Sequence, residues 1–446
     1  MKSCRGSFSG AACQNISRCL QFFPPVFLRG LTARKSGLPN ESSRLVRRSF
    51  PESKRWGEVW LPLQASQARE RSAAPALIHR AGHVNLMWIV HLDEAIPPAN
   101  QIDKVWLTTV LKKIGALTSG EIGSIDVAAS PSTNSQITRI RIEYKAETRG
   151  DAPRSLILKT VEADAGFVTS SEVNYYARDY RGLTAAPIPK CYAAHVYDNG
   201  SYSVLMEDLS DTHEKDTSPS LEYGIAVATA LARLHAYGWG EERVNQLGGS
   251  IPDASKLDRY VGHVRRGLDS MLEATRTDIP DSWRQTILDI FQHHPRKMLR
   301  RTKDAIGFTI VHGDVNPGNI LYSVGEGKVY FLDRQPFTWS LTTWLGVSDL
   351  SYLMVQYWST DVRRDFEMSV LREYHRQLLA NGVTGYDWDQ LIADYQLCAV
   401  QAAYTVVEWC IKAEDRERMR WLWWLELERT MQAFFDLGCG ELWRPE

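Results

Sequence analysis

The spacing of apolar residues changes at about residue 210, and this change constrains the fold of the 446-residue chain more than any other feature. Before it, Ile140, Ile142 and Tyr144 alternate with charged residues, which is the period of a half-buried strand. After it, apolar residues recur every three positions from Ile225 to Leu234, which is typical of one helix face. The pattern predicts an α+β chain with a small strand-rich N-lobe and a large helical C-lobe.

Composition and the pattern of apolar residues divide the chain into three stretches. Residues 1–86 carry 14 Lys and Arg against 4 Asp and Glu and show no sustained apolar period, so we expect them to lie outside any core. They are interpreted as a disordered tail, as a mitochondrial transit segment, or as sequence upstream of a true start at Met87. Residues 87–209 are assigned to the N-lobe and residues 210–446 to the C-lobe.

Both lobes are expected to combine helices and strands. In the N-lobe the patterns predict helices over 105–114 and 172–180 and strands over 137–145, 156–159 and 202–206. In the C-lobe they predict brief strands at 308–311, 320–322 and 329–332 between long helical stretches, which resume at about residue 350. Gly325 to Gly327 is interpreted as the turn of a hairpin.

Charge and hydropathy disfavour several classes of partner. The formal net charge is -1, and the chain beyond the basic tail is mildly acidic, so no nucleic-acid partner is expected. The longest uncharged window near the C-terminus, residues 395–407, is too short to cross a bilayer. We therefore expect no membrane span and a cytoplasmic location, or a mitochondrial one if residues 1–86 are a transit segment.

Cysteine and histidine spacing gives no support for a structural metal site. The 7 Cys are scattered, with no Cys-x-x-Cys pair, as expected in a reducing compartment. His213, His293 and His294 have no partner at metal-ligand spacing, and we interpret them as surface or capping residues.

The most informative string runs from Val311 to Ile320 and reads Val-His-Gly-Asp-Val-Asn-Pro-Gly-Asn-Ile. Phosphoryl-transfer enzymes use an Asp followed five residues later by an Asn, on a loop between strands, for two tasks. Asp314 would accept the proton of a substrate hydroxyl, and Asn319 would offer an amide oxygen to Mg²⁺. Asp333, at the end of an apolar strand, suits a second ligand of the same hard cation. The alternative is a turn-rich loop in which Asp and Asn only cap backbone groups.

The motif from His312 to Asn319, followed by Asp333-Arg334-Gln335, resembles the aminoglycoside phosphotransferase and choline kinase superfamily. Within it, residues 171–176 are most similar to the ecdysteroid-kinase-like branch. The resemblance covers about residues 100 to 440. It implies a bilobal protein-kinase-like fold, ATP and Mg²⁺ as cofactors, and the transfer of a phosphoryl group to a small molecule.

The resemblance also completes a nucleotide site. Lys159, after an apolar run, would pair with the α- and β-phosphates, and Glu172 would hold it in place. The segment from Glu207 to Leu209 is similar to the family's hinge and would present backbone groups to adenine.

Two positions depart from the family pattern. The segment between Val127 and Ile137, where kinases carry a Gly-rich loop over the phosphates, contains no Gly, so backbone N–H groups and the hydroxyls of Ser132, Thr133 and Ser135 would have to replace it. Arg334 stands where relatives usually carry an aromatic residue, and its guanidinium is expected either to reach phosphate or to lie on the surface.

Asp349, at the start of the helix near Leu350, is expected to be an N-terminal helix residue, and the resemblance implies that it also braces the catalytic loop.

The chain lacks the Ala-Pro-Glu-type motif with which protein kinases dock peptides, so the acceptor is expected to be a hydroxylated small molecule, with the helices from Leu350 to Leu437 as the wall of its pocket. The Gly-free segment motivates one competing hypothesis, a catalytically silent nucleotide-binding or interaction protein. Oligomeric state and acceptor identity do not follow from the sequence.

Overall fold

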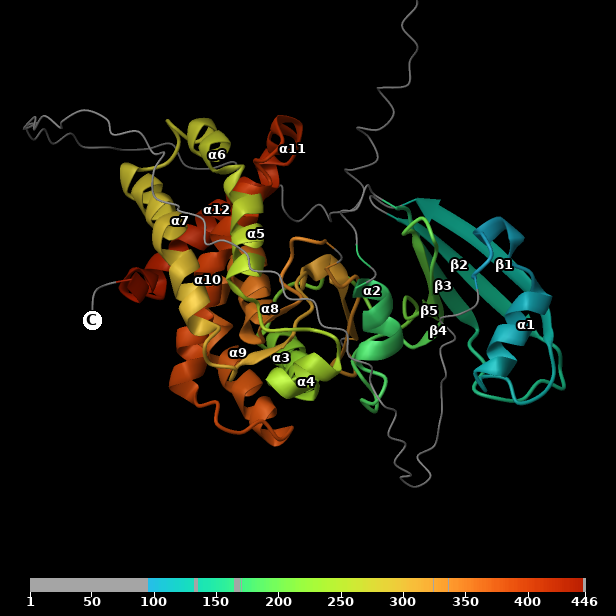
Figure 1. Ribbon diagram of the computed structural model, residues 1–446. Helices are drawn as coiled ribbons and strands as arrows, with labels where there is room; N and C mark the ends of the chain where they lie inside the picture. The colour runs from blue at the N-terminus through green and yellow to red at the C-terminus, as the bar shows by residue number, and fades with distance from the viewer. Residues whose placement is uncertain are drawn as a thin grey trace, which may run out of the picture. The chain divides into compact units, whose positions relative to one another are not determined.

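A computed structural model describes residues 95–131, 135–163, 169, 171–323, 325–335 and 337–443. The chain order begins with helix α1 (Lys104–Lys113), strands β1 (Ile122–Pro131), β2 (Gln136–Tyr144) and β3 (Ser155–Val161), helix α2 (Ser171–Asn174), and strands β4 (Cys191–Val196) and β5 (Tyr202–Glu207). These strands form one antiparallel sheet in the order β1-β2-β3-β5-β4 (Figure 1).

The N-lobe core forms between α1 and the sheet. The Asp103 carboxylate accepts hydrogen bonds from the Val105 and Trp106 backbone N–H groups and so caps α1. Leu107 and Leu111 are buried in the same cluster as Ile140 of β2. The predicted helix is confirmed. Val105 nevertheless points to solvent, because it precedes Leu107 by two residues and therefore lies on the opposite side of the helix.

The C-lobe is built mainly from helices and contains two small two-stranded sheets. Its helices are α3 (Leu221–Tyr237), α4 (Glu241–Gln246), α5 (Ala254–Arg265), α6 (Leu268–Ala274), α7 (Asp281–Arg301), α8 (Val347–Tyr352), α9 (Thr360–Ala380), α10 (Trp388–Glu408), α11 (Ala413–Arg418) and α12 (Arg420–Asp436). Helix α10 packs against α5, α7, α8 and α12, and it carries a nearly continuous run of buried residues. Among the described helices, none has the length and apolar character that crossing a membrane requires.

The short strands lie between α7 and α8. Strand β6 (Phe308–Ile310) pairs with β9 (Thr343–Leu345), and β7 (Ile320–Ser323) pairs with β8 (Lys328–Phe331). The turn around Gly327, which has φ +63°, closes the β7–β8 hairpin as predicted. The expected α+β fold, with a small strand-rich lobe and a large helical lobe, is confirmed, and the loop from Val311 to Asn319 joins β6 to β7.

Two of the histidines differ from expectation. His294 is fully buried between α7 and α10: its Nε2 lies 2.9 Å from the Leu397 carbonyl oxygen, and its Nδ1 lies 3.1 Å from the Tyr404 hydroxyl. Since a carbonyl only accepts, Nε2 carries the proton and Tyr404 donates to Nδ1. His213 is also buried, with its ring edge-on to that of Tyr330. The expectation that these side chains lie on the surface was wrong because both pack between elements that are distant in sequence.

Burial lowers the pKa of His294 from 6.5 to about 4, which predicts acid sensitivity of the fold. As the pH falls below 6.5 the unfolded chain protonates this residue before the folded protein does, so the stabilising contribution of neutral His294 falls by up to about 3 kcal/mol by pH 4. In His294→Gln, the free energy of unfolding, measured by urea denaturation, should depend less steeply on pH over this interval. His293→Gln is the matched control, and an unchanged slope in His294→Gln would contradict the assignment.

Candidate active site

One buried carboxylate, that of Asp349, holds the beginning of the loop from Val311 to Asn319. The two Asp349 oxygens accept hydrogen bonds from the backbone N–H groups of His312 at 2.8 Å and Gly313 at 2.9 Å. His235 Nε2 lies 3.0 Å from the same carboxylate. Burial alone would raise the pKa of Asp349, but the hydrogen bond and charge of His235 and the backbone donors lower it below its usual value. Asp349 therefore fixes the start of the loop, as the resemblance implied.

His312 ties this loop to the end of β8. Its Nε2 donates to the Leu332 carbonyl oxygen at 2.7 Å, and its Nδ1 accepts from the Asp314 backbone N–H at 3.3 Å. Burial lowers the pKa of His312 to about 4, so the ring is neutral at physiological pH. The loop that carries Asp314 is therefore locked to the strand that precedes Asp333.

Asp314 and Asn319 lie in direct contact. Asn319 Nδ2 donates to the Asp314 main-chain oxygen at 2.9 Å and to Asp314 Oδ2 at 3.0 Å. Because a main-chain oxygen only accepts, this geometry fixes the orientation of the amide and turns Asn319 Oδ1 away from Asp314. Burial raises the pKa of Asp314 to about 6, against hydrogen bonds from neighbouring side chains that favour the carboxylate.

Lys159 joins Asp333 to Glu172. Its ammonium nitrogen lies 2.8 Å from Glu172 Oε1 and 2.8 Å from Asp333 Oδ1. Although burial would lower the pKa of Lys159, the two carboxylates raise it above its ordinary value, so the side chain is a cation. Tyr202 donates to the second oxygen of Glu172 at 2.5 Å and so fixes that carboxylate. The structure thus brings together Lys159, Glu172 and Asp333, which the sequence selected from three separate segments.

The residues around Asp333 fit a divalent cation. Asp333 adopts a left-handed backbone with φ +58°, and its side chain is 43% exposed. Lys159 engages one of its oxygens and lowers its pKa, against burial, which alone would raise it. Asp333 Oδ2 and Asn319 Oδ1 are oxygen donors, the type that Mg²⁺ prefers. Among the described residues, no group of three or more His, Cys, Asp or Glu is placed to hold a metal ion.

Arg334 lies neither at a phosphate nor on the surface, and both expectations for it were wrong. Its guanidinium is 96% buried, pairs with Asp179 Oδ2 at 2.6 Å and donates to the Val311 carbonyl oxygen at 3.2 Å. Asp179 ends a π-helical turn (Tyr175–Asp179) that continues from the helix of Glu172. Arg334 therefore joins the Glu172 segment to the catalytic loop, a long-range contact that no sequence pattern indicates.

The structure describes only some of the other residues that were predicted to contact the nucleotide. Ser132 and Thr133 lie outside the described residues, and Ser135 is half-buried directly before β2. In the predicted hinge, the Glu207 N–H donates to the Lys190 carbonyl oxygen, and the Leu209 carbonyl oxygen accepts from Thr212 and His213. Those two groups are used within the fold, so recognition of adenine would have to rely on the remaining backbone groups of this segment.

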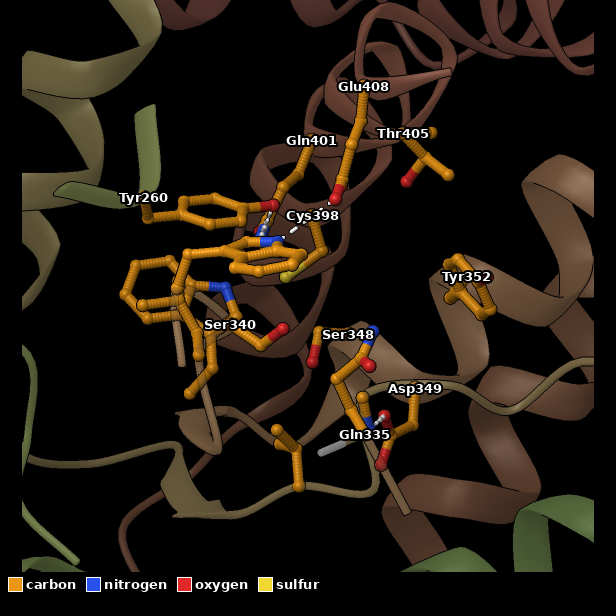
Figure 2. A pocket seen from close by; sticks show the side chains of 16 residues that line it. Tyr260, Gln335, Ser340, Ser348, Asp349, Tyr352, Cys398, Gln401, Thr405 and Glu408 are labelled. Atoms are coloured by element: carbon orange, nitrogen blue, oxygen red, sulfur yellow. Dashed lines mark hydrogen bonds between the residues drawn. The ribbon is translucent and has the colours of Figure 1, made fainter. Parts of the chain in front are cut away.

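A pocket of about 120 Å³ opens beside the catalytic loop (Figure 2). Gly313 of the loop and Asp349 of α8 line one side of it, and α10 forms another side. The α10 residues that line it are Cys398, Gln401, Ala402, Thr405 and Glu408. Trp339 forms another side; its ring stacks between Phe337, at 4.6 Å, and His263, at 4.1 Å, and its Nε1 donates to Glu408 at 2.9 Å.

Sequence reasoning missed two side chains that contact Asp314. The amide of Asn316 donates to Asp314 Oδ1 at 2.9 Å, and the hydroxyl of Tyr352 donates to the same oxygen at 3.1 Å. Tyr352 also lines the pocket. Its position three residues after Asp349, and therefore on the same helix face, was the available signal.

Comparison with known proteins identifies a family. The model described as "Phosphotransferase enzyme family" matches residues 144–392, which is more than half of the chain. A search of curated proteins finds no match. The narrower resemblance to the ecdysteroid-kinase-like branch stays a prediction.

Several solved structures are similar at low identity. An aminopropanol kinase associated with a microcompartment is 12% identical, covers 70% of this chain and 91% of its own, and has a TM-score of 0.46. An ethanolamine kinase from Plasmodium vivax is 12% identical, with coverages of 70% and 81% and a TM-score of 0.44. A spectinomycin phosphotransferase in complex with ADP and spectinomycin is 10% identical, with coverages of 76% and 99% and a TM-score of 0.44.

Removing one partner of the Arg334–Asp179 ion pair should lower the stability more than removing both partners. Arg334→Leu leaves a buried carboxylate with Arg178 as its remaining cation, and should lower the free energy of unfolding by about 3 kcal/mol. Arg334→Leu/Asp179→Leu removes both charges and should recover part of that loss. Chemical denaturation of the two variants measures the difference. A double variant less stable than Arg334→Leu alone would contradict this account.

Proposed function

Because the chain belongs to the phosphotransferase enzyme family, we propose that it moves the γ-phosphoryl group of ATP to a hydroxyl group of a small molecule. The observation that carries the proposal has three parts. Asn319 contacts Asp314, the backbone N–H of Leu332, next to Asp333, donates to the Asn319 carbonyl oxygen, and Asp333 pairs with a lysine held by Glu172. A loop that only capped its own backbone would not require a buried cation from a distant strand at the same place.

The nucleotide would be held mainly by the N-lobe. In the proposed complex the Lys159 ammonium pairs with the α- and β-phosphates, and Glu172, itself fixed by Tyr202, keeps the ammonium in place. Backbone groups between Glu207 and Leu209 contact adenine. The hydroxyls of Ser132, Thr133 and Ser135 would contact the phosphates in place of a Gly-rich loop.

Asn319 and Asp333 would hold Mg²⁺ through side-chain oxygens. Bound Mg²⁺ neutralises phosphate charge as the phosphoryl group is transferred. Lys159, which is paired with Asp333, would add a second positive charge.

Asp314 would act on the acceptor. With a pKa of about 6 it is mostly ionised at neutral pH and can accept the proton of a hydroxyl group. The hydroxyl oxygen then forms a bond to the γ-phosphorus, the bond from that phosphorus to the bridging oxygen breaks, and ADP leaves. Asp314 positions the nucleophile and takes up its proton, so its removal should affect the chemical step rather than nucleotide binding.

The pocket beside the loop is the proposed acceptor site. Its size suits a small molecule or the reacting part of one, and α10 and Trp339 supply two of its sides. None of its 16 lining residues is Lys or Arg. An acceptor whose reacting part is strongly anionic is therefore disfavoured. The cytoplasm remains the proposed compartment, with mitochondria as the alternative.

One observation favours a second candidate function. The sequence between Val127 and Ile137 contains no Gly, which would weaken the binding of the phosphates. The second candidate is therefore a catalytically silent protein that still binds nucleotide or a partner.

Replacing the proposed base separates these functions. In Asp314→Asn, product formation with γ-labelled ATP, across a panel of amino alcohols, sugars, sterols and aminoglycosides, should fall by about 10² to 10⁴. The shift in melting temperature caused by ATP should persist. Asp389→Asn, which changes an exposed carboxylate of α10, is the control. Full turnover by Asp314→Asn would refute the mechanism.

Replacing the proposed metal ligand tests the second half of the site. ATP should stabilise the wild-type protein more strongly with Mg²⁺ than without it, because metal and nucleotide bind together. Asp333→Asn tolerates the same left-handed backbone but removes the charge, so it should lose the Mg²⁺-dependent part of the melting-temperature shift. An identical Mg²⁺ response in the variant and the wild type would show that Asp333 is not a ligand.

A further inference from the structure

The two carboxylate oxygens of Asp314 accept different numbers of hydrogen bonds. Oδ1 accepts from two donors, Asn316 Nδ2 at 2.9 Å and the Tyr352 hydroxyl at 3.1 Å. Oδ2 accepts from one donor, Asn319 Nδ2 at 3.0 Å. Each carboxylate oxygen has about two lone-pair positions, so these contacts fill Oδ1 and leave one position on Oδ2.

The Tyr352 hydroxyl has a fixed direction because a second tyrosine supports it. Its oxygen lies 3.1 Å from the hydroxyl oxygen of Tyr357. Tyr352 uses its only proton on Asp314, so Tyr357 is the donor between the two hydroxyls. The hydroxyl chain therefore runs in one direction, from Tyr357 through Tyr352 to the carboxylate.

The backbone explains how residues five apart meet. Helix α8 changes at Leu353 into a π-helical turn (Leu353–Tyr357). In a π turn the hydrogen bonds join residues five apart, which brings Tyr352 and Tyr357 onto one face, whereas an α-helix would turn them apart. Their rings meet edge to face at 5.4 Å. The π turn is therefore the local feature that builds the pair beside Asp314.

We propose that Tyr352 is a positioning residue that anchors Asp314 Oδ1, so that Oδ2 is the oxygen that receives the acceptor's hydroxyl proton. This inference rests on the proposed function of Asp314 as the base. It extends that function in two ways: it identifies the carboxylate oxygen that reacts, and it names the side chain that determines which oxygen this is. Tyr352 is placed to do so because it borders both the carboxylate and the pocket wall (Figure 2).

The physical need for such an anchor lies in the side chain of aspartate. Rotation about the bond to the carboxylate has broad minima, so an unanchored group samples many orientations. Displacement of a reacting atom by about 1 Å can cost a factor of about 100 in rate. With Asn316 still in place after loss of the Tyr352 hydroxyl, we expect about a tenfold loss.

Tyr352→Phe tests the proposal because it removes one oxygen and keeps the ring in the pocket wall. Water serves as the probe acceptor, and ADP release from Mg²⁺–ATP without added alcohol is the activity measured. In the variant kcat should fall about tenfold, while KM for ATP stays within about twofold of the wild type. Tyr386→Phe, which removes a buried hydroxyl bonded to Asp394 outside the site, should leave both constants unchanged.

The outcomes separate this inference from the proposed function. If the wild type releases ADP and Tyr352→Phe keeps its kcat, the positioning role is overturned while the function stands. If the wild type neither responds to Mg²⁺–ATP in a thermal shift nor releases ADP, the function itself fails. A crystal structure of Tyr352→Phe supplies a readout without substrate: a rotated or disordered Asp314 carboxylate supports the role, and an unchanged one overturns it.

Discussion

The candidate site depends on one buried cation, the Lys159 ammonium, placed between Glu172 of the N-lobe and Asp333 of the C-lobe. Burying a single charge is costly, and the cost is offset only when partners and hydrogen bonds surround it. Two carboxylates and the Tyr202 hydroxyl provide that environment. In the complex proposed above, phosphate oxygens would replace Asp333 as a partner of the lysine, and the Asp333 carboxylate would then be free to bind a metal ion.

A second buried network fixes the geometry around Asp314. Asp349 holds the backbone at the beginning of the loop from Val311 to Asn319, and His312 and Arg334 join that loop to neighbouring segments. All three side chains have backbone partners, and Asp349 and Arg334 have side-chain partners as well, which makes the network rigid. Rigid support allows Asp314 to keep a raised pKa and a defined orientation in an environment that penalises its charge.

The sequence predicted those elements whose own residues show a clear strand or helix period. Strand β2 alternates strictly, and α3 has a continuous apolar face, so both were found. Strands β1 and β4 were missed: they form the two edges of the sheet, where β1 is largely exposed and β4 is rich in small residues. Spacing selected the motif residues of the site. The buried positions of Arg334 and His294 and the contact of Tyr352 with Asp314 arise from long-range packing or from a π turn, which periodicity does not record.

The most direct test of the account is a crystal structure of the protein with Mg²⁺ and a non-hydrolysable ATP analogue. The account predicts a metal ion bound by Asn319 Oδ1 and Asp333, Lys159 on the α- and β-phosphates, and a γ-phosphate that faces Asp314. A nucleotide bound elsewhere, or a metal ion that contacts neither Asn319 nor Asp333, would contradict it.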